Sequence, residues 1–139
     1  MDPFSLTVGI LTMLEAGGNI GRGLKKVVAL RKAPDILLAL NNEVVDLQIV
    51  IEDVDDLLRQ HEEIALGPTR SLCQALERSK ETLSRLESLI FYELTMTKGG
   101  ELRLDRSVWL RKEHDVLELR DRTRADRLHL LSALGVLAA

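Results

Sequence analysis

The sequence predicts an all-α protein, an antiparallel four-helix bundle with a long C-terminal helix. Leu, Glu, Arg and Ala dominate the chain and only 3% of its residues are aromatic, a composition that favours helices. Breaks at residues 33–35, 67–69 and 98–100 recur at intervals of about thirty residues and would fold the chain back on itself. Its three prolines fall near the expected helix ends, where proline is tolerated: Pro3, Pro34 and Pro68.

We expect a single domain over residues 1–139, with helices at about residues 5–31, 35–64, 69–96 and 107–137. In the second and third helices, one residue set steps alternately by three and four, which is typical of a helix that packs along a seam. The second seam contains Leu37, Leu40, Val44, Leu47, Ile51, Val54 and Leu58, and the third contains Leu72, Leu76, Ser79, Leu83, Leu86 and Ile90. Four acids fall off the second seam and are expected on a solvated face: Glu43, Asp46, Asp53 and Asp56.

The last helix is nearly all charged over residues 120–127 and apolar at both ends. Such a centre must face solvent or be held by ion pairs one turn apart. The available pairs are Glu118–Arg122, Asp121–Arg124 and Arg122–Asp126. We expect Trp109 to be a packing anchor at the start of this helix. Residues 101–107 should form a polar connector, with a short extended piece at Leu102–Leu104.

Charge is unevenly distributed and argues against a nucleic-acid partner. The chain carries a net charge of −3, and residues 34–66 hold nine acids against Arg59 alone. No basic face outweighs this segment, whereas phosphate backbones require a concentrated one. The first apolar stretch follows Asp2 and precedes the basic residues, which is the reverse of a secretory signal. Together with the single cysteine, Cys73, this indicates a cytosolic protein with a buried structural thiol.

The sequence contains no recognisable catalytic or cofactor site, so we expect neither an enzyme nor a bound cofactor or metal. His61, His114 and His129 lack metal-ligand spacing with one another or with Cys73. The glycines of residues 17–23 follow no strand and precede no lysine–Ser/Thr pair, so they do not form a phosphate loop.

The N-terminal segment is unusually apolar. From Pro3 to Gly21 its one charge is Glu15, and the length approaches the ~20 residues that span a bilayer core. Small residues recur at multiples of four, as in close helix pairing within membranes: Ser5, Gly9, Gly17 and Gly21. A basic cluster that could meet anionic headgroups comes next: Arg22, Lys25, Lys26, Arg31 and Lys32.

Two interpretations of this segment remain open, and they are compatible. A helix apolar on most sides is also typical of the central helix of a soluble bundle, with glycines that admit neighbours. The glycines weaken the helix by up to ~1 kcal/mol each relative to alanine. The composition therefore suits a core helix at rest that becomes a membrane helix when released.

The order of these features resembles the HeLo-like family, the N-terminal domains of fungal STAND (NOD-like) receptors and of related cell-death effectors. The similar features are the opening residues 1–10 (MDPFSLTVGI), the glycine cluster, the acidic second helix and the Arg-rich last helix. That helix opens with residues 109–112 (WLRK) and ends with residues 128–134 (LHLLSAL). The resemblance covers essentially the whole chain.

The resemblance implies a bundle related to the four-helix domain of the mixed-lineage kinase domain-like pseudokinase. It implies membrane-targeting, pore-forming-type programmed cell death, activated by oligomerisation, with the protein cytoplasmic at rest and at the plasma membrane when active. The implied lipid-facing residues are Phe4, Leu6, Ile10, Leu11 and Leu14, and the implied helix-contact glycines are Gly9, Gly17 and Gly21. Glu15 would line a pore or face water.

The implied partners are further copies of the chain, anionic membrane lipids and an upstream receptor joined through an appended region. The alternative is a non-toxic helical oligomerisation or adaptor domain of a NOD-like receptor. A region beyond Ala139 would discriminate between the two, since a nucleotide-binding region indicates a receptor and a short amyloid-like motif indicates an effector.

Overall fold

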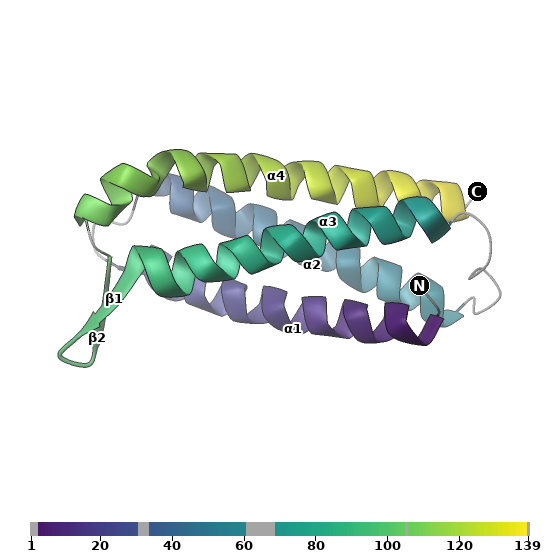
Figure 1. The fold of residues 1–139 in the computed structure, drawn as a ribbon, viewed down its shortest axis with the longest axis horizontal. Coiled ribbons are helices and arrows are strands. Elements are labelled where there is room, and N and C mark those ends of the chain that lie inside the picture. The colour runs from purple at the N-terminus through teal and green to yellow at the C-terminus, as the bar shows by residue number, and fades with distance from the viewer. Residues whose placement is uncertain (1–2, 31–33, 61–68, 105, 139) are drawn as a thin grey trace.

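The computed structural model describes residues 3–30, 34–60, 69–104 and 106–138 and confirms the all-α bundle. Four long helices, α1 (Pro3–Val28), α2 (Asp35–Gln60), α3 (Thr69–Ser88) and α4 (Arg106–Ala138), alternate in direction along the long axis (Figure 1). Helix α2 packs mainly on α1 and α4, and α3 also contacts both α1 and α4. The order around the bundle is therefore α1–α2–α4–α3, which places α1 diagonally opposite α4.

The heptad seams predicted in α2 and α3 form the centre of the core. Every residue of the α2 seam is buried except Leu58, which is half-buried, and all six residues of the α3 seam are buried. The Ser79 hydroxyl, the polar member of the α3 seam, donates to the Ala75 carbonyl at 2.9 Å, which satisfies it inside the core. Trp109 is also buried, as expected of a packing anchor, whereas the Cys73 thiol is only half-buried.

The end of the third helix differs from the prediction. Helix α3 ends at Ser88 and continues as a six-residue π-helix, η2 (Leu89–Leu94), instead of running to Met96. The Thr95 hydroxyl donates to the Ile90 carbonyl at 2.7 Å, and Thr95 itself is extended. This side-chain bond satisfies one of the carbonyls left unpaired where the helix ends.

A β-hairpin lies where a helix cap and a polar connector were expected. Strand β1 (Thr95–Lys98) pairs antiparallel with β2 (Glu101–Leu104), joined by Gly99 and Gly100, whose φ angles are 63° and 82°. Two positive φ values produce the tight turn whose twist suits a hairpin. The extended piece predicted at Leu102–Leu104 is thus the end of β2. The first helix also ends earlier than predicted, at Val28, and the expected end of the second helix lies outside the described residues.

The acidic residue Glu43 is buried between α2 and α4, not on a solvated face as predicted. Its side-chain carboxylate accepts from Arg124 Nε at 2.9 Å and lies 3.6 Å from Arg127 Nη2. The charged centre of α4 is therefore held partly across the bundle and partly along its own helix, where Arg120 Nη2 lies 3.2 Å from Asp121 Oδ1. Further interhelical contacts join Arg85 to Glu118 at 3.8 Å and Lys112 Nζ to Glu93 at 2.9 Å. The contact with Glu93 raises the pKa of the Lys112 amine.

A second buried acid, Asp126, lies on α4 beside α3. Its residue exposure is 6%, and its Oδ2 has no hydrogen-bond partner among the described residues. Burial raises the pKa of the Asp126 carboxyl, against the opposing effects of the Thr82 hydroxyl and the Arg122 charge. A raised folded-state pKa means that folding disfavours the ionised form.

Replacing Asp126 with asparagine should therefore stabilise the protein slightly at neutral pH. The contribution of Asp126 to the free energy of unfolding is fully present below its ordinary pKa of 3.8. It is lost as the pH rises through the raised value, because the ionised form is disfavoured in the folded protein. We expect less than about 1 kcal/mol of gain, because the cationic neighbours lose a counter-charge. Urea denaturation of D126N and the parent at pH 7 and at acid pH measures it. A gain that does not shrink on acidification would contradict this explanation.

Candidate functional site: helix α1 and its seat in the bundle

The inner face of α1 is an apolar seam with two glycine positions. Its buried positions again step alternately by three and four: Ile10, Met13, Gly17, Ile20, Leu24 and Val27, with Gly23 also buried beside them. This spacing places them on the side of the helix that meets α2 and α3. The sequence therefore correctly indicates a helix that is packed in the folded bundle.

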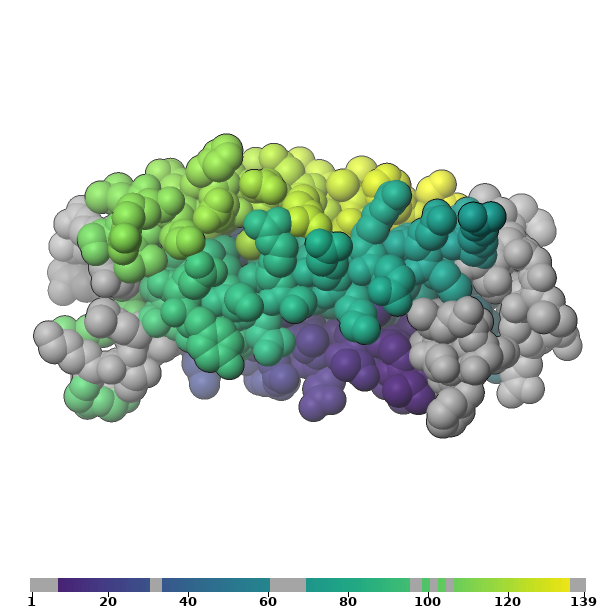
Figure 2. Space-filling model, in the orientation of Figure 1, coloured from purple at the N-terminus to yellow at the C-terminus, as the bar shows by residue number. Residues whose placement is uncertain are grey.

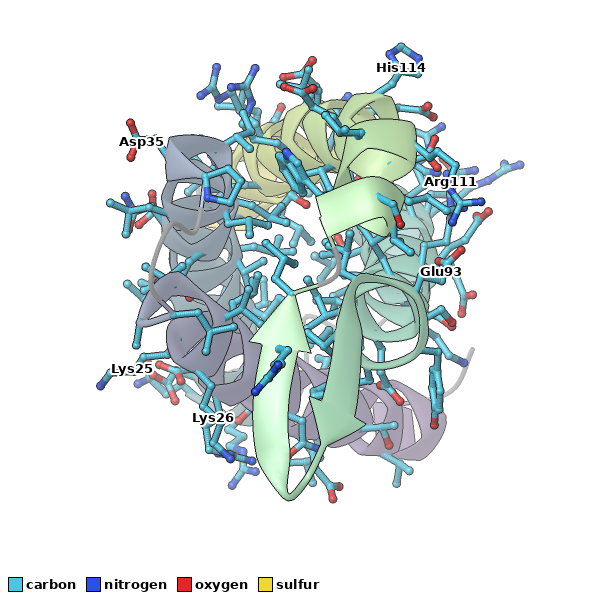
Figure 3. All side chains as sticks on the ribbon, turned by 90° about the vertical axis from the view of Figure 1, so that its left-hand side faces the viewer. Lys25, Lys26, Asp35, Glu93, Arg111 and His114 are labelled. Carbon is cyan, nitrogen blue, oxygen red and sulfur yellow. The ribbon has the colours of Figure 1, made fainter. Side chains whose placement is uncertain are left out.

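The outer face of α1 is apolar at one end and basic at the other. Val8 and Leu11 are 47% and 45% exposed, and neither belongs to the buried seam. Glu15 faces solvent further along, followed by the exposed bases Arg22, Lys25 and Lys26. Figure 2 shows this surface of α1 along the lower edge of the molecule, and in Figure 3 Lys25 and Lys26 point away from the bundle. The N-terminal half of α1 thus carries apolar residues on two sides.

The structure separates the residues predicted to face lipid. Ile10 is buried in the core, Leu14 is half-buried and Leu11 is exposed. Phe4 and Leu6 lie in α1, but their side chains are outside the described set. Contact of all five with lipid would thus require Ile10 to leave the core.

Only one predicted helix-contact glycine has a close neighbour in the folded bundle. A Cβ atom built on Gly17 would lie 3.7 Å from Gln48 Cδ of α2, whereas one on Gly9 or Gly21 would meet nothing within 4 Å. Gly9 and Gly21 are therefore not sites of close packing within this bundle, and their role as helix-contact positions stays a prediction. The close approach is at Gly23, where a Cβ would lie 2.8 Å from the Phe91 ring of η2. The four-residue spacing could not identify Gly23, because it is out of step with the others.

The same substitution at Gly21 and Gly23 should have different effects. Gly21→Ala should stabilise the protein by up to about 1 kcal/mol, because alanine is the better helix former and its methyl group meets open space. Gly23→Ala should gain less or lose stability, because Phe91 must move. Urea midpoints of the two variants measure the difference. In a Phe91→Ala background, Gly21→Ala and Gly23→Ala should change stability by similar amounts. Equal stability gains when Phe91 is present would refute the close contact.

The basic end of α1 borders an open cleft. Its volume is about 420 Å³, and its lining includes Arg22, Lys26, Glu87, Phe91 and Thr95. Arg22 also donates to the Asn19 amide oxygen. The remaining predicted lipid-contacting bases, Arg31 and Lys32, lie outside the described residues. Arg22, Lys25 and Lys26 thus form an exposed cationic surface at the C-terminal end of α1, with Glu87 opposing it in the cleft.

The described ranges contain neither a membrane-spanning helix nor a metal-binding cluster. No helix among them is long and apolar enough to cross a bilayer, and no group of three or more His, Cys, Asp or Glu side chains there could hold a metal ion. In comparisons with known proteins, the chain matches no protein-family model, no curated protein and no solved structure. The resemblance to the HeLo-like family therefore stays a prediction.

Proposed function

We propose that this domain is a membrane-targeting, pore-forming-type execution domain of programmed cell death, activated by oligomerisation. In the resting cytoplasmic state α1 is packed in the bundle. Clustering by an upstream fungal NOD-like receptor would let α1 leave and insert into the plasma membrane. The observation that carries the proposal is the two-sided apolar character of α1, with Ile10 and Met13 inside and Val8 and Leu11 outside.

Two further features support release of α1 rather than of another helix. First, α1 lies diagonally opposite α4, so its departure leaves in place both the contacts of α4 with α2 and α3 and the ion pairs that α4 makes with them. Second, glycines at positions 17, 18, 21 and 23 lower the intrinsic stability of its C-terminal half. After release, Lys25 and Lys26 would contact anionic headgroups, worth about 1 kcal/mol per base near the surface.

The test is leakage of dye from anionic vesicles by the clustered protein. Val8→Glu with Leu11→Glu should reduce the leakage rate at least about tenfold, because two carboxylates would have to enter the apolar phase. Both side chains are exposed in the bundle, so folding should be preserved. Leu128→Glu on α4, at a similarly exposed position, is the matched control and should leak like the parent. Undiminished leakage by the α1 variant would overturn the proposal.

The second candidate function is a non-toxic oligomerisation or adaptor domain of a NOD-like receptor. The exposed acids of α2 favour it, because an anionic membrane would repel them. This candidate predicts oligomers or partner binding without affinity for lipid. Co-sedimentation of the protein with anionic vesicles would therefore count against it.

A further inference from the structure

The outer face of α2 carries an apolar stripe that no other element among the described residues covers. Leu38, Val45 and Ile49 are 46%, 43% and 50% exposed, and their steps of seven and four keep them on one side of the helix. Further along the same face come the exposed acids Glu52 and Asp56. The face is thus apolar in its first half and acidic in its second.

The outer face of α1 is also apolar in its first part but basic in its last part, and the exposed Glu15 lies between the two. Its apolar residues, Val8 and Leu11, come first, and its bases come about ten residues later. Both helices run the length of the bundle (Figure 1) and each contains 26 residues. The two faces are therefore similar in length and complementary in charge.

The charges on these faces are not neutralised within the molecule. Among the residues that the structure describes, Glu52, Asp53 and Asp56 of α2 have no ion-pair partner, and neither have Lys25 and Lys26 of α1. The acids of α2 that have partners, Glu43 and Asp55, are the buried ones. Each outer face is thus left with unpaired charge that a partner could satisfy.

We propose that the outer face of α2 binds the outer face of α1 from a second copy of the chain, with the two helices parallel. Val8 and Lys26 are eighteen residues apart, as are Leu38 and Asp56, which corresponds to about 27 Å along each helix. When Val8 is aligned with Leu38, Arg22 falls beside Glu52 and Lys26 beside Asp56, while Glu15 falls beside Val45. An antiparallel alignment would instead bring the acids against Val8 and Leu11.

The contact uses a different surface on each copy. Such a heterologous contact leaves one face unused at each end, so it adds further copies until a ring closes or a filament forms. Exposed ion pairs are individually weak and are screened by salt, so the assembly should be reversible and salt-sensitive. The inference rests on the proposed function in one respect, because it supplies the clustering step that precedes release of α1.

The test is a charge exchange, measured by sedimentation without lipid at low salt. One variant reverses the acids (Glu52→Lys with Asp56→Lys) and the other reverses the bases (Arg22→Glu with Lys26→Glu). The parent's average mass should increase with concentration, whereas each variant alone should stay monomeric. An equimolar mixture should associate again, because each reversed face meets the opposite charge on the other variant. Glu77→Lys with Glu81→Lys, exposed acids at the same spacing on α3, should associate like the parent.

Three results would overturn the proposed contact: a parent that is monomeric at every concentration, association by either variant alone, or a mixture that stays monomeric. Circular dichroism checks that each variant folds. If the first variant does not, Glu52→Gln with Asp56→Gln replaces it, and the mixture should then form heterodimers through its two unaltered faces and no larger species. Vesicle leakage is measured separately. Charge-dependent association without leakage would refute the membrane function and support the contact, whereas leakage with no rescue in the mixture would do the reverse.

Discussion

Replacing Glu43 with lysine should destabilise the bundle by about 3 kcal/mol, the low end of the range for leaving a buried charge unpaired. Glu43 is 8% exposed and contacts Arg124 and Arg127 of α4. The substitution would place a third cation between α2 and α4. We take the low end because the Arg124 side chain is 53% exposed and can move into water. Urea denaturation at neutral pH and low salt measures the loss.

A charge exchange provides the control for this prediction. Adding Arg124→Glu to Glu43→Lys should recover a substantial part of the lost stability, because it restores an attractive pair between α2 and α4. Asp53→Lys is the matched single substitution, since Asp53 is an exposed acid on the same helix, and it should change stability by about 0.5 kcal/mol or less. Equal losses at positions 43 and 53 would contradict the buried ion pair.

Tethering α1 to α2 by a disulfide should suppress vesicle leakage at least about tenfold, if release of α1 is the active step. Position 17 is suitable because a Cβ there lies 3.9 Å from Gln48 Cγ, so the two side chains face each other directly between α1 and α2. The variant carries Gly17→Cys and Gln48→Cys, with Cys73→Ser to remove the native thiol. Clustered protein is assayed on anionic vesicles before and after reduction.

Reduction of the tether makes each sample its own control. Leakage should return to the level of the parent once the disulfide is reduced, because the same chain can then release α1. Each single-cysteine variant in the Cys73→Ser background should be insensitive to the reductant. Full leakage by the oxidised double-cysteine protein would show that α1 need not leave α2, and the proposed mechanism would be wrong.

The core of this bundle could be predicted from the sequence because periodicity reports which residues share a face. The seams of α2 and α3 are buried as their spacing indicates. Periodicity does not report which helix lies opposite. The burial of Glu43 therefore could not be predicted, since it depends on Arg124, eighty-one residues away in the chain and on a different helix.

The hairpin was missed for a different reason. Glycine at residues 99 and 100 can end a helix or form a two-residue turn, because both require a positive φ. The alternation of Thr95, Thr97, Leu102 and Leu104 around these glycines was the signal for a hairpin. The helical spacing of apolar residues through Ile90 instead favours a helix that continues to Met96. No local feature of the sequence indicates the π-helix in which that helix ends.

The candidate site was predicted in part. The sequence correctly indicates that α1 is apolar enough to be packed and that it ends in bases. It does not indicate which apolar residues face outward, because Ile10 and Leu11 are chemically alike and differ only in direction. The importance of Gly23 depends on Phe91, which the fold brings to it.

The order of the helices around the bundle has a consequence for hydrogen exchange. Helices α1 and α4 each contact both α2 and α3, but among the described residues the ion pairs to α2 and α3 come from α4. A molecule that loses α1 keeps both interfaces of α4 and the Glu43–Arg124 pair. The amides of α1 should therefore exchange through a partial opening whose free energy is lower than that of global unfolding. Helices α2 and α4 should be protected up to the global limit, so the molecule would unfold in two stages.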